Sequence, residues 1–103
     1  MALADLDDIW SYIADELKSP RAAERTVGTI THTVSRLADF PDSGTPLSAA
    51  YSLATNYRYV VAGKYLVFYR HESAVYIDRI LYSGRDYIKI LFDEAIKTDA
   101  FGA

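Results

Sequence analysis

Residues 57–87 constrain the fold of this chain more than any other stretch, because they predict three consecutive β-strands. The segments 57–61, 65–70 and 75–82 are rich in β-branched and aromatic side chains. Links of three and four residues separate these segments, and such lengths suit hairpin loops. The pattern therefore predicts an antiparallel meander, a sheet that can pack against helices on one face while the other face stays open to a partner.

The residues before this sheet predict two helices. Apolar side chains recur at three- and four-residue spacing over residues 2–17, which indicates an amphipathic helix with Trp10 in the core. Ser19 suits an N-cap and Pro20 suits the first helical position, so we expect a second helix over residues 20–40. The short link between them predicts that the two helices pack as an antiparallel hairpin.

After the sheet, residues 87–97 carry apolar side chains on one helical face and predict a short C-terminal helix. The element order α-α-β-β-β-α predicts an α+β fold, in which an N-terminal α-helical hairpin packs on an antiparallel three-stranded sheet. A chain of 103 residues is long enough to form one core, so we expect a single domain over residues 1–103.

The overall composition excludes several classes of protein. The chain has no cysteine, which excludes disulfides, thiolate chemistry and cysteine-based zinc sites. No apolar run approaches the roughly 20 residues that a membrane span needs, and the acidic N-terminus is unlike a signal peptide. We therefore expect a cytoplasmic protein with no membrane contact. The net charge of −3 argues against a protein whose main activity is binding nucleic-acid phosphates, so any such contact must be local.

Side chains alternate between the two faces of a strand, so the sequence of the middle strand indicates which residues share a face of the sheet. We expect Leu66 and Phe68 on the helix-covered face, with Tyr65 and Tyr69 on the open face. In the last strand, Arg79 stands between two apolar residues of the same face. We expect Arg79 to lie beneath the helices and to pair with a carboxylate there.

The sheet region also holds the residue types of a binding surface. Residues 57–87 contain seven of the nine tyrosines, and residues 57–89 carry six lysines and arginines against three acidic residues, a net charge of +3. Tyrosine and arginine are enriched at binding hot spots, so we expect a partner surface on the open sheet face. The alternative interpretation is that these tyrosines merely cover the sheet.

Known catalytic signatures are absent from the sequence. It contains no phosphate loop, no dinucleotide fingerprint and no metal-spaced cluster, so we expect neither a metal nor a cofactor. One constellation near the open side of the sheet could do chemistry, and it consists of Arg58, Arg70, Tyr82 and Arg85. Arginines can neutralise a phosphate in a cleavage transition state, and a tyrosine can relay a proton only if its pKa is lowered. The same residues would equally bind an acidic peptide.

Several motifs resemble those of one known family. Residues 2–13, ALADLDDIWSYI, resemble the opening A-x-x-D-L-x-x-I-x-x-Y-I of the RelE/ParE toxin superfamily. Further matches to its second helix, the following turn and its last two strands fall at residues 22–23, 37–41, 44, 46–47, 65–70 and 79–87. Each motif is weak alone, but their order and spacing over residues 2–91 identify the chain as similar to this superfamily.

This resemblance implies the toxin of a bacterial type II toxin–antitoxin pair, a growth inhibitor of the kind associated with plasmid stabilisation. It also implies a cognate antitoxin whose extended segment wraps the toxin, and hence a toxin–antitoxin hetero-oligomer. Members of the superfamily either cleave mRNA on the ribosome or poison DNA gyrase. Both activities use the same fold, so the fold does not choose between them.

Two departures from the family pattern bear on activity. The family has a β-strand before the first helix, whereas here the chain starts almost at that helix, so either the start is truncated or this member lacks the strand. A missing strand would expose a sheet edge that an antitoxin could fill by strand addition. Arg85 matches an arginine of the nuclease branch near the end of the last strand. Tyr65 stands at the middle-strand arginine of that branch, and Tyr82 stands at a histidine frequent in both branches.

Three functional hypotheses follow. The first is a non-enzymatic, ParE-like toxin that poisons DNA gyrase, supported by the acidic pI, the incomplete nuclease set and the ParE-like strand motifs. The second is a ribosome-dependent mRNA endonuclease that uses Arg58, Tyr82 and Arg85. The third is an inactive member that only binds its antitoxin. The residues expected to contact the target or the antitoxin are Arg58, Tyr65, Tyr69, Arg70, Arg85 and Tyr87.

Overall fold

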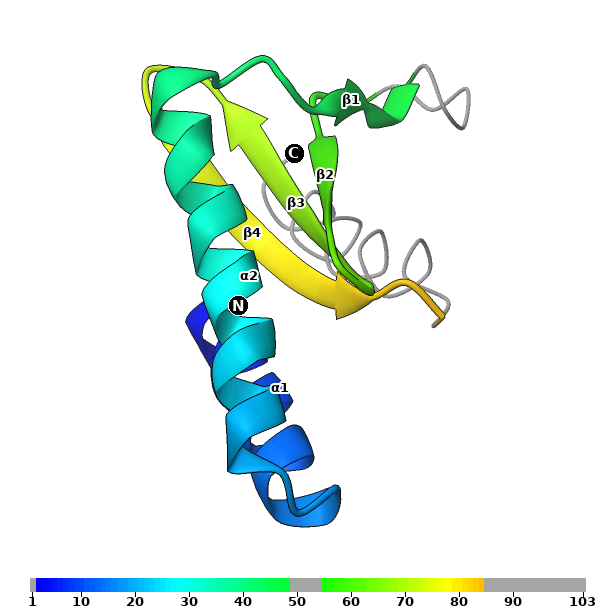
Figure 1. Ribbon diagram of the computed structural model, residues 1–103. Coiled ribbons are helices and arrows are strands. Elements are labelled where there is room, and N and C mark those ends of the chain that lie inside the picture. Colours follow the sequence, from blue (N-terminus) through cyan, green and yellow to red (C-terminus); the bar gives the residue numbers. More distant parts are fainter. Residues whose placement is uncertain (1, 49–54, 85–103) are drawn as a thin grey trace.

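The computed structural model describes residues 2–48 and 55–84 and places a helical hairpin against one face of an antiparallel sheet (Figure 1). The expected α+β class is confirmed. The elements are α1 (Ala2–Ser11), η1 (Tyr12–Glu16), α2 (Pro20–Asp39), β1 (Thr45–Pro46), β2 (Arg58–Ala62), β3 (Tyr65–His71) and β4 (Val75–Tyr82). The helix expected over residues 87–97 lies outside the described residues.

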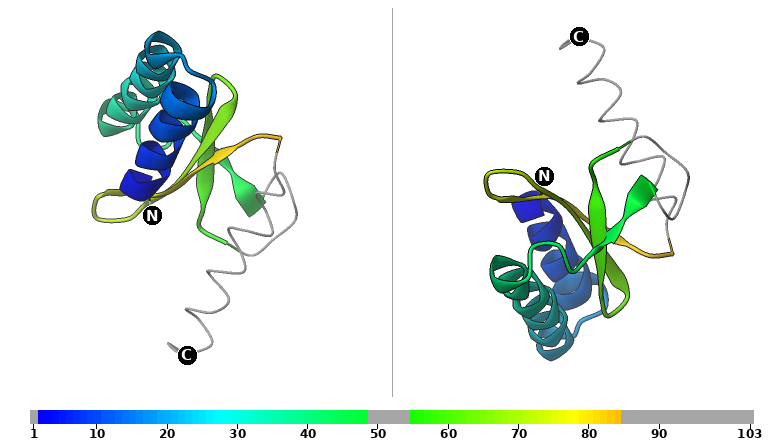
Figure 2. Two further views of the ribbon diagram at one scale, coloured as in Figure 1. Left: turned by 90° about the horizontal axis from the view of Figure 1, so that it is seen from below. Right: turned by 90° about the horizontal axis from the view of Figure 1, so that it is seen from above.

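The helical hairpin forms where the sequence predicts it. α1 continues directly into η1, a π-helical turn, so helical structure runs from Ala2 to Glu16. Ser19 caps α2 by accepting a hydrogen bond from the backbone N–H of Ala22 at 3.3 Å, and Pro20 occupies the first helical position. The two views of Figure 2 show both helices on the same side of the sheet.

The sheet has four strands in the order β1-β2-β3-β4, all antiparallel, rather than the three that the sequence predicts. The additional strand, β1, pairs Thr45 with Tyr59 and Pro46 with Arg58. A strand of two residues is too short to produce an alternating pattern, so the sequence holds no signal for it. Pro46 suits a strand at the edge of a sheet, because proline has no N–H to donate to a ladder.

The two faces of the sheet are the reverse of those predicted. Val67 of β3 packs beneath the helices in one core cluster with Ile9 and Ile30. Leu66 and Phe68 point to the other face and are buried in a second cluster. The middle strand is apolar at both alternating sets of positions. Its pattern therefore tells which residues share a face but not which face meets the helices.

Trp10 is partly exposed, and the prediction that it packs in the core is wrong. Its side chain is 41% exposed, whereas Ile9 and Ile13 supply the buried stripe of this helical segment. Adjacent helical residues point about 100° apart, so Trp10 faces away from the stripe that Ile9 begins. His32 on α2 is exposed.

Gly28 in the middle of α2 offers a stabilising substitution. A Cβ at this position would meet no heavy atom within 4 Å beyond the helix's own nearby backbone. Because glycine is less favourable than alanine in a helix interior, we expect Gly28→Ala to raise the free energy of unfolding by about 0.5–1 kcal/mol. Urea denaturation of the two proteins measures the change. A lower midpoint for the variant would mean that this helix face is packed more closely than the structure indicates.

Candidate functional site

The structure places the expected site residues at opposite ends of the sheet. Arg58 pairs with Tyr69 across β2 and β3, and Arg70 follows Tyr69 at this end. Tyr65 pairs with Tyr82 across β3 and β4 at the other end. Four residues of β3, at about 3.3 Å each, separate the two ends by about 13 Å along the strands. Two of the expected residues lie outside the described part of the chain, namely Arg85 and Tyr87.

Arg58 is held by the loop that leads into β1. Its Nη1 donates hydrogen bonds to the carbonyl oxygens of Gly44 at 2.9 Å and of Asp42 at 3.4 Å. Its Nε also lies 3.8 Å from the Asp42 carboxylate, and Nδ1 of His71 lies 2.8 Å from that same group. The hydrogen bond with His71, aided by the charge of Arg58, lowers the pKa of Asp42. Arg58 therefore has a structural role in fixing this loop.

Arg70 is held by carboxylates of its own hairpin. Its Nε and Nη2 donate to the two carboxylate oxygens of Asp78 at 2.8 and 3.1 Å, a bidentate pair, and its Nη1 donates to Glu72 at 3.1 Å. The guanidinium also lies 5.2 Å from the ring centroid of Tyr76. The hydrogen bond with Asp78 raises the pKa of Arg70. Arg70, like Arg58, therefore uses its hydrogen-bond donors within the fold.

Tyr69 is buried, and its predicted place on an open face is wrong. Its side chain is 0% exposed, and its hydroxyl donates to the carbonyl of Pro41 at 2.8 Å and accepts from the N–H of Gly44 at 2.9 Å. The loop between α2 and β1 supplies both of these backbone partners and lies against the ring. A pattern within the strand could not predict contact with a loop that lies 25 residues or more away in the sequence.

Tyr65 and Tyr82 form the other end of the expected site. Their rings meet edge to face, with centroids 5.7 Å apart. Burial is the main reason that the pKa of Tyr65 is raised, and the neighbouring Tyr82 adds to the effect. A tyrosine that deprotonates less readily suits packing and recognition better than proton transfer at neutral pH.

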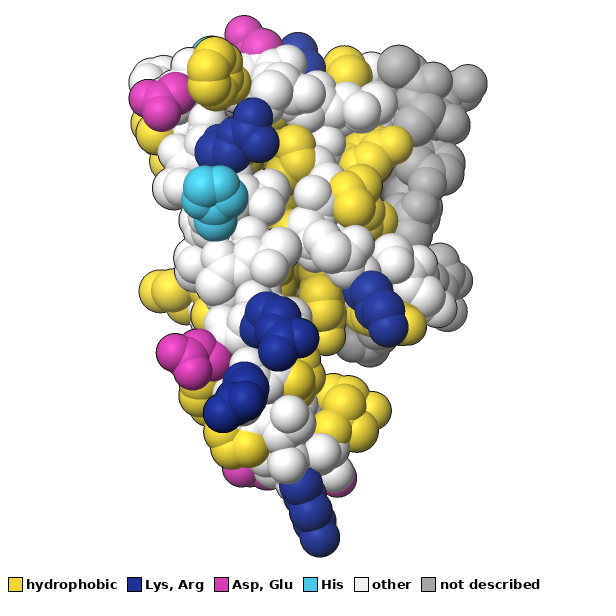
Figure 3. All heavy atoms as spheres, viewed as in Figure 1, with side chains coloured by type: hydrophobic (Ala, Val, Ile, Leu, Met, Phe, Trp, Pro, Cys, Tyr) yellow, Lys and Arg dark blue, Asp and Glu magenta, His cyan; other side chains and the backbone are white. Residues whose placement is uncertain are grey.

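A groove of about 900 Å³ opens beside these two tyrosines, between the helical hairpin and the β2–β3 turn (Figure 3). Apolar side chains of α1 and η1 form one wall, and Tyr12 lies among them. Tyr65 and Tyr82 belong to the sheet wall, while Arg25 of α2 and Lys64 of the turn add positive charge. We call this hollow the tyrosine groove, defined by Tyr12, Arg25, Lys64, Tyr65 and Tyr82.

The acidic residues of the groove are Asp5 and Asp8, and Asp5 has a structural role. Its carboxylate forms an ion pair with Arg79 at 2.9 Å, which confirms the predicted pairing of Arg79 with a carboxylate of the helical layer. Within residues 2–48 and 55–84, no group of three acidic or histidine side chains could hold a metal ion. No helix of that described part is long and apolar enough to cross a membrane. The lining of the groove combines apolar, aromatic and cationic side chains.

Three residues of the tyrosine groove were not singled out as site residues from the sequence. They come from three separate elements and are Tyr12, Arg25 and Lys64. Only the packing of the helical hairpin on the sheet brings them together. The one available signal was the place of Tyr12 in the motif of residues 2–13, whereas Arg25 and Lys64 resemble ordinary surface cations.

Comparisons with known proteins bear on this site. The family model described as the ParE toxin of the type II toxin–antitoxin system, parDE, matches residues 1–87. Toxin ParE1 of Caulobacter vibrioides is 35% identical over 83 residues, which cover 81% of this chain and 82% of that protein. The family match includes every residue that defines the tyrosine groove.

Proposed function

Because this chain belongs to the ParE toxin family of type II toxin–antitoxin systems, we propose that it stops growth by binding DNA gyrase through the tyrosine groove. We propose further that its cognate antitoxin neutralises it by covering the same groove. The observation that carries the proposal is the gathering of three tyrosines with Arg25 and Lys64 in one hollow. Both partners would place the toxin in the cytoplasm.

The tyrosine groove has the composition of a protein-binding site. Tyr12 and Tyr82 are 55% and 43% exposed, so both rings are available to a partner. Aromatic side chains beside an apolar wall act as anchors in protein interfaces, and cations at a rim favour an acidic partner. We therefore expect the partner segment to insert apolar side chains between the walls and to carry carboxylates toward Arg25 and Lys64.

Cleavage of mRNA has less support than gyrase binding. That hypothesis requires Arg58 and Tyr82 to act on one phosphate, with Arg85 beside them. Arg58 lies about 13 Å from Tyr82 along the strands. Its guanidinium already donates to the carbonyl oxygens of Gly44 and Asp42. We therefore keep the ribosome-dependent endonuclease as the alternative to be tested beside gyrase.

Two tyrosines of nearly equal exposure allow a controlled test of whether the tyrosine groove binds gyrase. Tyr82 in the groove is 43% exposed, and Tyr76 at the other end of the sheet is 44% exposed. We expect Tyr82→Ala to weaken binding to purified gyrase by about 10- to 100-fold, because truncating an aromatic anchor costs about 1.4–2.8 kcal/mol. Tyr76→Ala should change the affinity by less than about threefold. Calorimetric titration measures both, and circular dichroism checks that both variants fold.

Brief induction in cells then identifies the target. We expect gyrase-linked DNA cleavage complexes to accumulate with the wild-type chain and with Tyr76→Ala, and to decline with Tyr82→Ala. Growth arrest with cleavage of ribosome-bound mRNA and without such complexes would overturn the proposal in favour of the endonuclease. Absence of growth arrest would indicate an inactive member that only binds its antitoxin.

The antitoxin complex tests the second half of the proposal. We expect the antitoxin to protect backbone amides of η1 and of the β2–β3 turn from hydrogen exchange. Tyr82→Ala should weaken antitoxin binding along with gyrase binding, because both partners use the same groove. Protection confined to the end of the sheet that holds Arg58 and Arg70 would contradict a shared groove.

A further inference from the structure

The lysines and arginines of the described ranges 2–48 and 55–84 fall into two groups. The three on the sheet, Arg58, Arg70 and Arg79, are all within ion-pair distance of carboxylates. The other five make no ion pair with any described residue, and they are Lys18, Arg21, Arg25, Arg36 and Lys64. Figure 3 shows lysine and arginine side chains spread along the face that α2 and the β2–β3 turn present.

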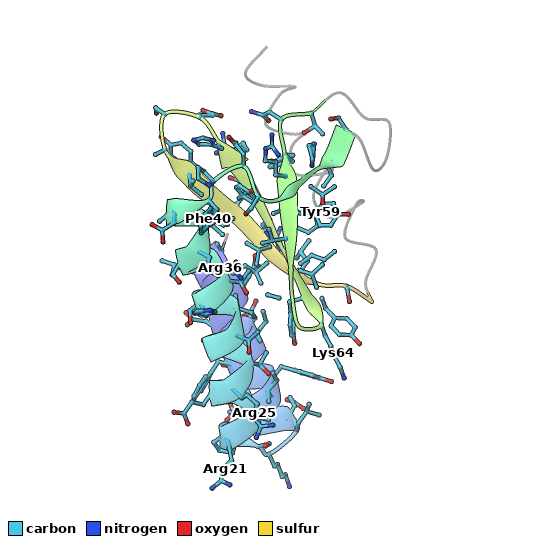
Figure 4. The ribbon with its side chains drawn as sticks, turned by 45° about the horizontal axis from the view of Figure 1, so that its top comes forward. Arg21, Arg25, Arg36, Phe40, Tyr59 and Lys64 are labelled. Atoms are coloured by element: carbon cyan, nitrogen blue, oxygen red, sulfur yellow. The ribbon has the colours of Figure 1, made fainter. Side chains whose placement is uncertain are left out.

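Three of these cations follow one line along α2, and we call Arg21, Arg25 and Arg36 the cationic stripe. The sequence Arg21, Arg25, Thr29, His32 and Arg36 advances by four, four, three and four residues, which is the spacing of one helix face. Figure 4 shows the three arginines along the helix. At about 1.5 Å per residue, the stripe is about 22 Å long.

Local helix energetics do not favour the two arginines at the start of this stripe. Arg21 lies in the first turn of α2, which has no acidic residue, although the positive end of the helix dipole disfavours a cation there. Arg21 and Arg25 are also like charges at i and i+4, a pair that destabilises a helix. Arg36 lies in the last turn of α2, where the helix dipole favours a cation, so the stability of α2 can explain Arg36. The charges of Arg21 and Arg25 are better explained by a contact outside the chain.

The surface between the arginines suits a polyanion better than a peptide. Gly28 and Thr29 occupy the middle of the stripe, and the Thr29 hydroxyl donates to the carbonyl of Arg25 at 3.0 Å. Small polar residues offer no apolar pocket of the kind that anchors a protein partner. A straight row of charges about 22 Å long instead covers about two-thirds of a turn of duplex DNA.

We propose that the cationic stripe binds the phosphate backbone of the DNA duplex held by gyrase, so that the bound toxin contacts DNA as well as protein. The proposal rests on the proposed function, because gyrase supplies the duplex. The net charge of −3 requires the contact to be local. Glu24 and Asp39 of α2 each stand three residues from a stripe arginine and offset part of its charge. Screening within about 10 Å at 0.1 M salt lets the stripe act separately from the acidic residues beyond that distance. Backbone contacts would not distinguish one base sequence from another.

The first experiment measures binding of the purified chain to a fluorescent 30-base-pair duplex at several salt concentrations. Three phosphate contacts predict a slope of log affinity against log salt of about −2.7, a loss of about 40-fold between 50 and 200 mM salt. The variant Arg21→Gln/Arg36→Gln should lower the steepness of the slope by about 1.8. Arg25 is kept because it also lines the tyrosine groove.

A matched control separates the stripe from net charge. The variant Ala4→Glu/Ser11→Glu also makes the net charge more negative by two, at exposed positions of α1. We expect this control to keep the wild-type slope. DNA binding by the cationic stripe would be contradicted if the wild-type chain and the stripe variant gave equal slopes. It would also be contradicted if the stripe variant and the control changed the slope equally.

The second experiment measures affinity for gyrase with and without bound DNA. We expect DNA to strengthen wild-type binding, and the stripe variant to bind DNA-free gyrase normally while losing that gain. Weaker binding of the stripe variant to DNA-free gyrase would overturn the proposal in favour of an acidic protein surface as the partner. If the wild-type chain does not bind gyrase at all, the proposed function is wrong. In that case gyrase cannot supply the duplex, whatever salt dependence is measured on free DNA.

Discussion

Replacing Asp5 with alanine should cost about 3–5 kcal/mol of unfolding free energy, because it removes one partner of a buried ion pair. The Asp5 carboxylate accepts hydrogen bonds from Nε of Arg79 at 2.9 Å, from Nη2 of Arg79 at 3.1 Å and from the backbone N–H of Ile80 at 2.9 Å. The two side chains are only 9% and 14% exposed. A domain of this size has about 5–15 kcal/mol of stability in total, so the variant should melt at a much lower temperature.

Two further variants test whether the ion pair is the cause. Asp7→Ala, at an exposed position of the same helix, should change stability by less than about 0.5 kcal/mol. Asp5→Leu combined with Arg79→Met should recover part of the loss, since apolar residues of similar volume can replace a buried pair, whereas the backbone N–H of Ile80 still loses its acceptor. A loss below about 1 kcal/mol for Asp5→Ala would show that the pair does not hold α1 to β4.

The Asp5–Arg79 pair illustrates which parts of the fold the sequence can predict. Arg79 stands in a strand between apolar residues, and a charge taken out of water needs a counter-charge. That reasoning predicts a carboxylate from the helical layer without identifying which one. The helical hairpin was predictable for similarly local reasons, because Ser19 and Pro20 mark the start of α2.

Sheet faces were not predictable, because β3 is apolar at both alternating sets of positions. Leu66 and Phe68 could meet the helices as well as Val67 could, and only the packed structure chooses. The short strand β1 was unpredictable for a similar reason, because it depends on pairing with residues distant in the sequence. Thr45 and Pro46 form a strand because Tyr59 and Arg58 are available to pair with them, and two residues carry no period of their own.

The candidate site was less predictable than the fold, because the role of an arginine depends on its neighbours in space. Arg58 and Arg70 are residues of a type found at binding hot spots, but Gly44 and Asp78 accept their hydrogen bonds. Lys64 lies on a hairpin turn, where a lysine is unremarkable in sequence. Its position beside the tyrosine groove depends on how the helical hairpin packs.

Gly44→Ala should lower the free energy of unfolding by about 3 kcal/mol, at the upper end of the range for overpacking. A Cβ at this position would lie 2.5 Å from the Tyr69 hydroxyl oxygen, 2.7 Å from Cε1 of the same ring and 2.9 Å from the carbonyl oxygen of Tyr59. The Tyr69 ring is buried, so it cannot move aside without disturbing packed neighbours. Gly28→Ala is the matched control and should shift the urea midpoint in the opposite direction.

Tyr69→Phe separates the hydrogen bonds at this contact from the steric conflict. It keeps the ring but removes the hydroxyl that bonds Gly44 and Pro41, which should cost about 1–3 kcal/mol. Adding Tyr69→Phe should not rescue Gly44→Ala, because Cε1 and the Tyr59 carbonyl remain too close. Full rescue would mean that the hydroxyl alone causes the conflict. At a temperature where Gly44→Ala stays folded, gyrase binding should persist, because the tyrosine groove lies at the other end of the sheet.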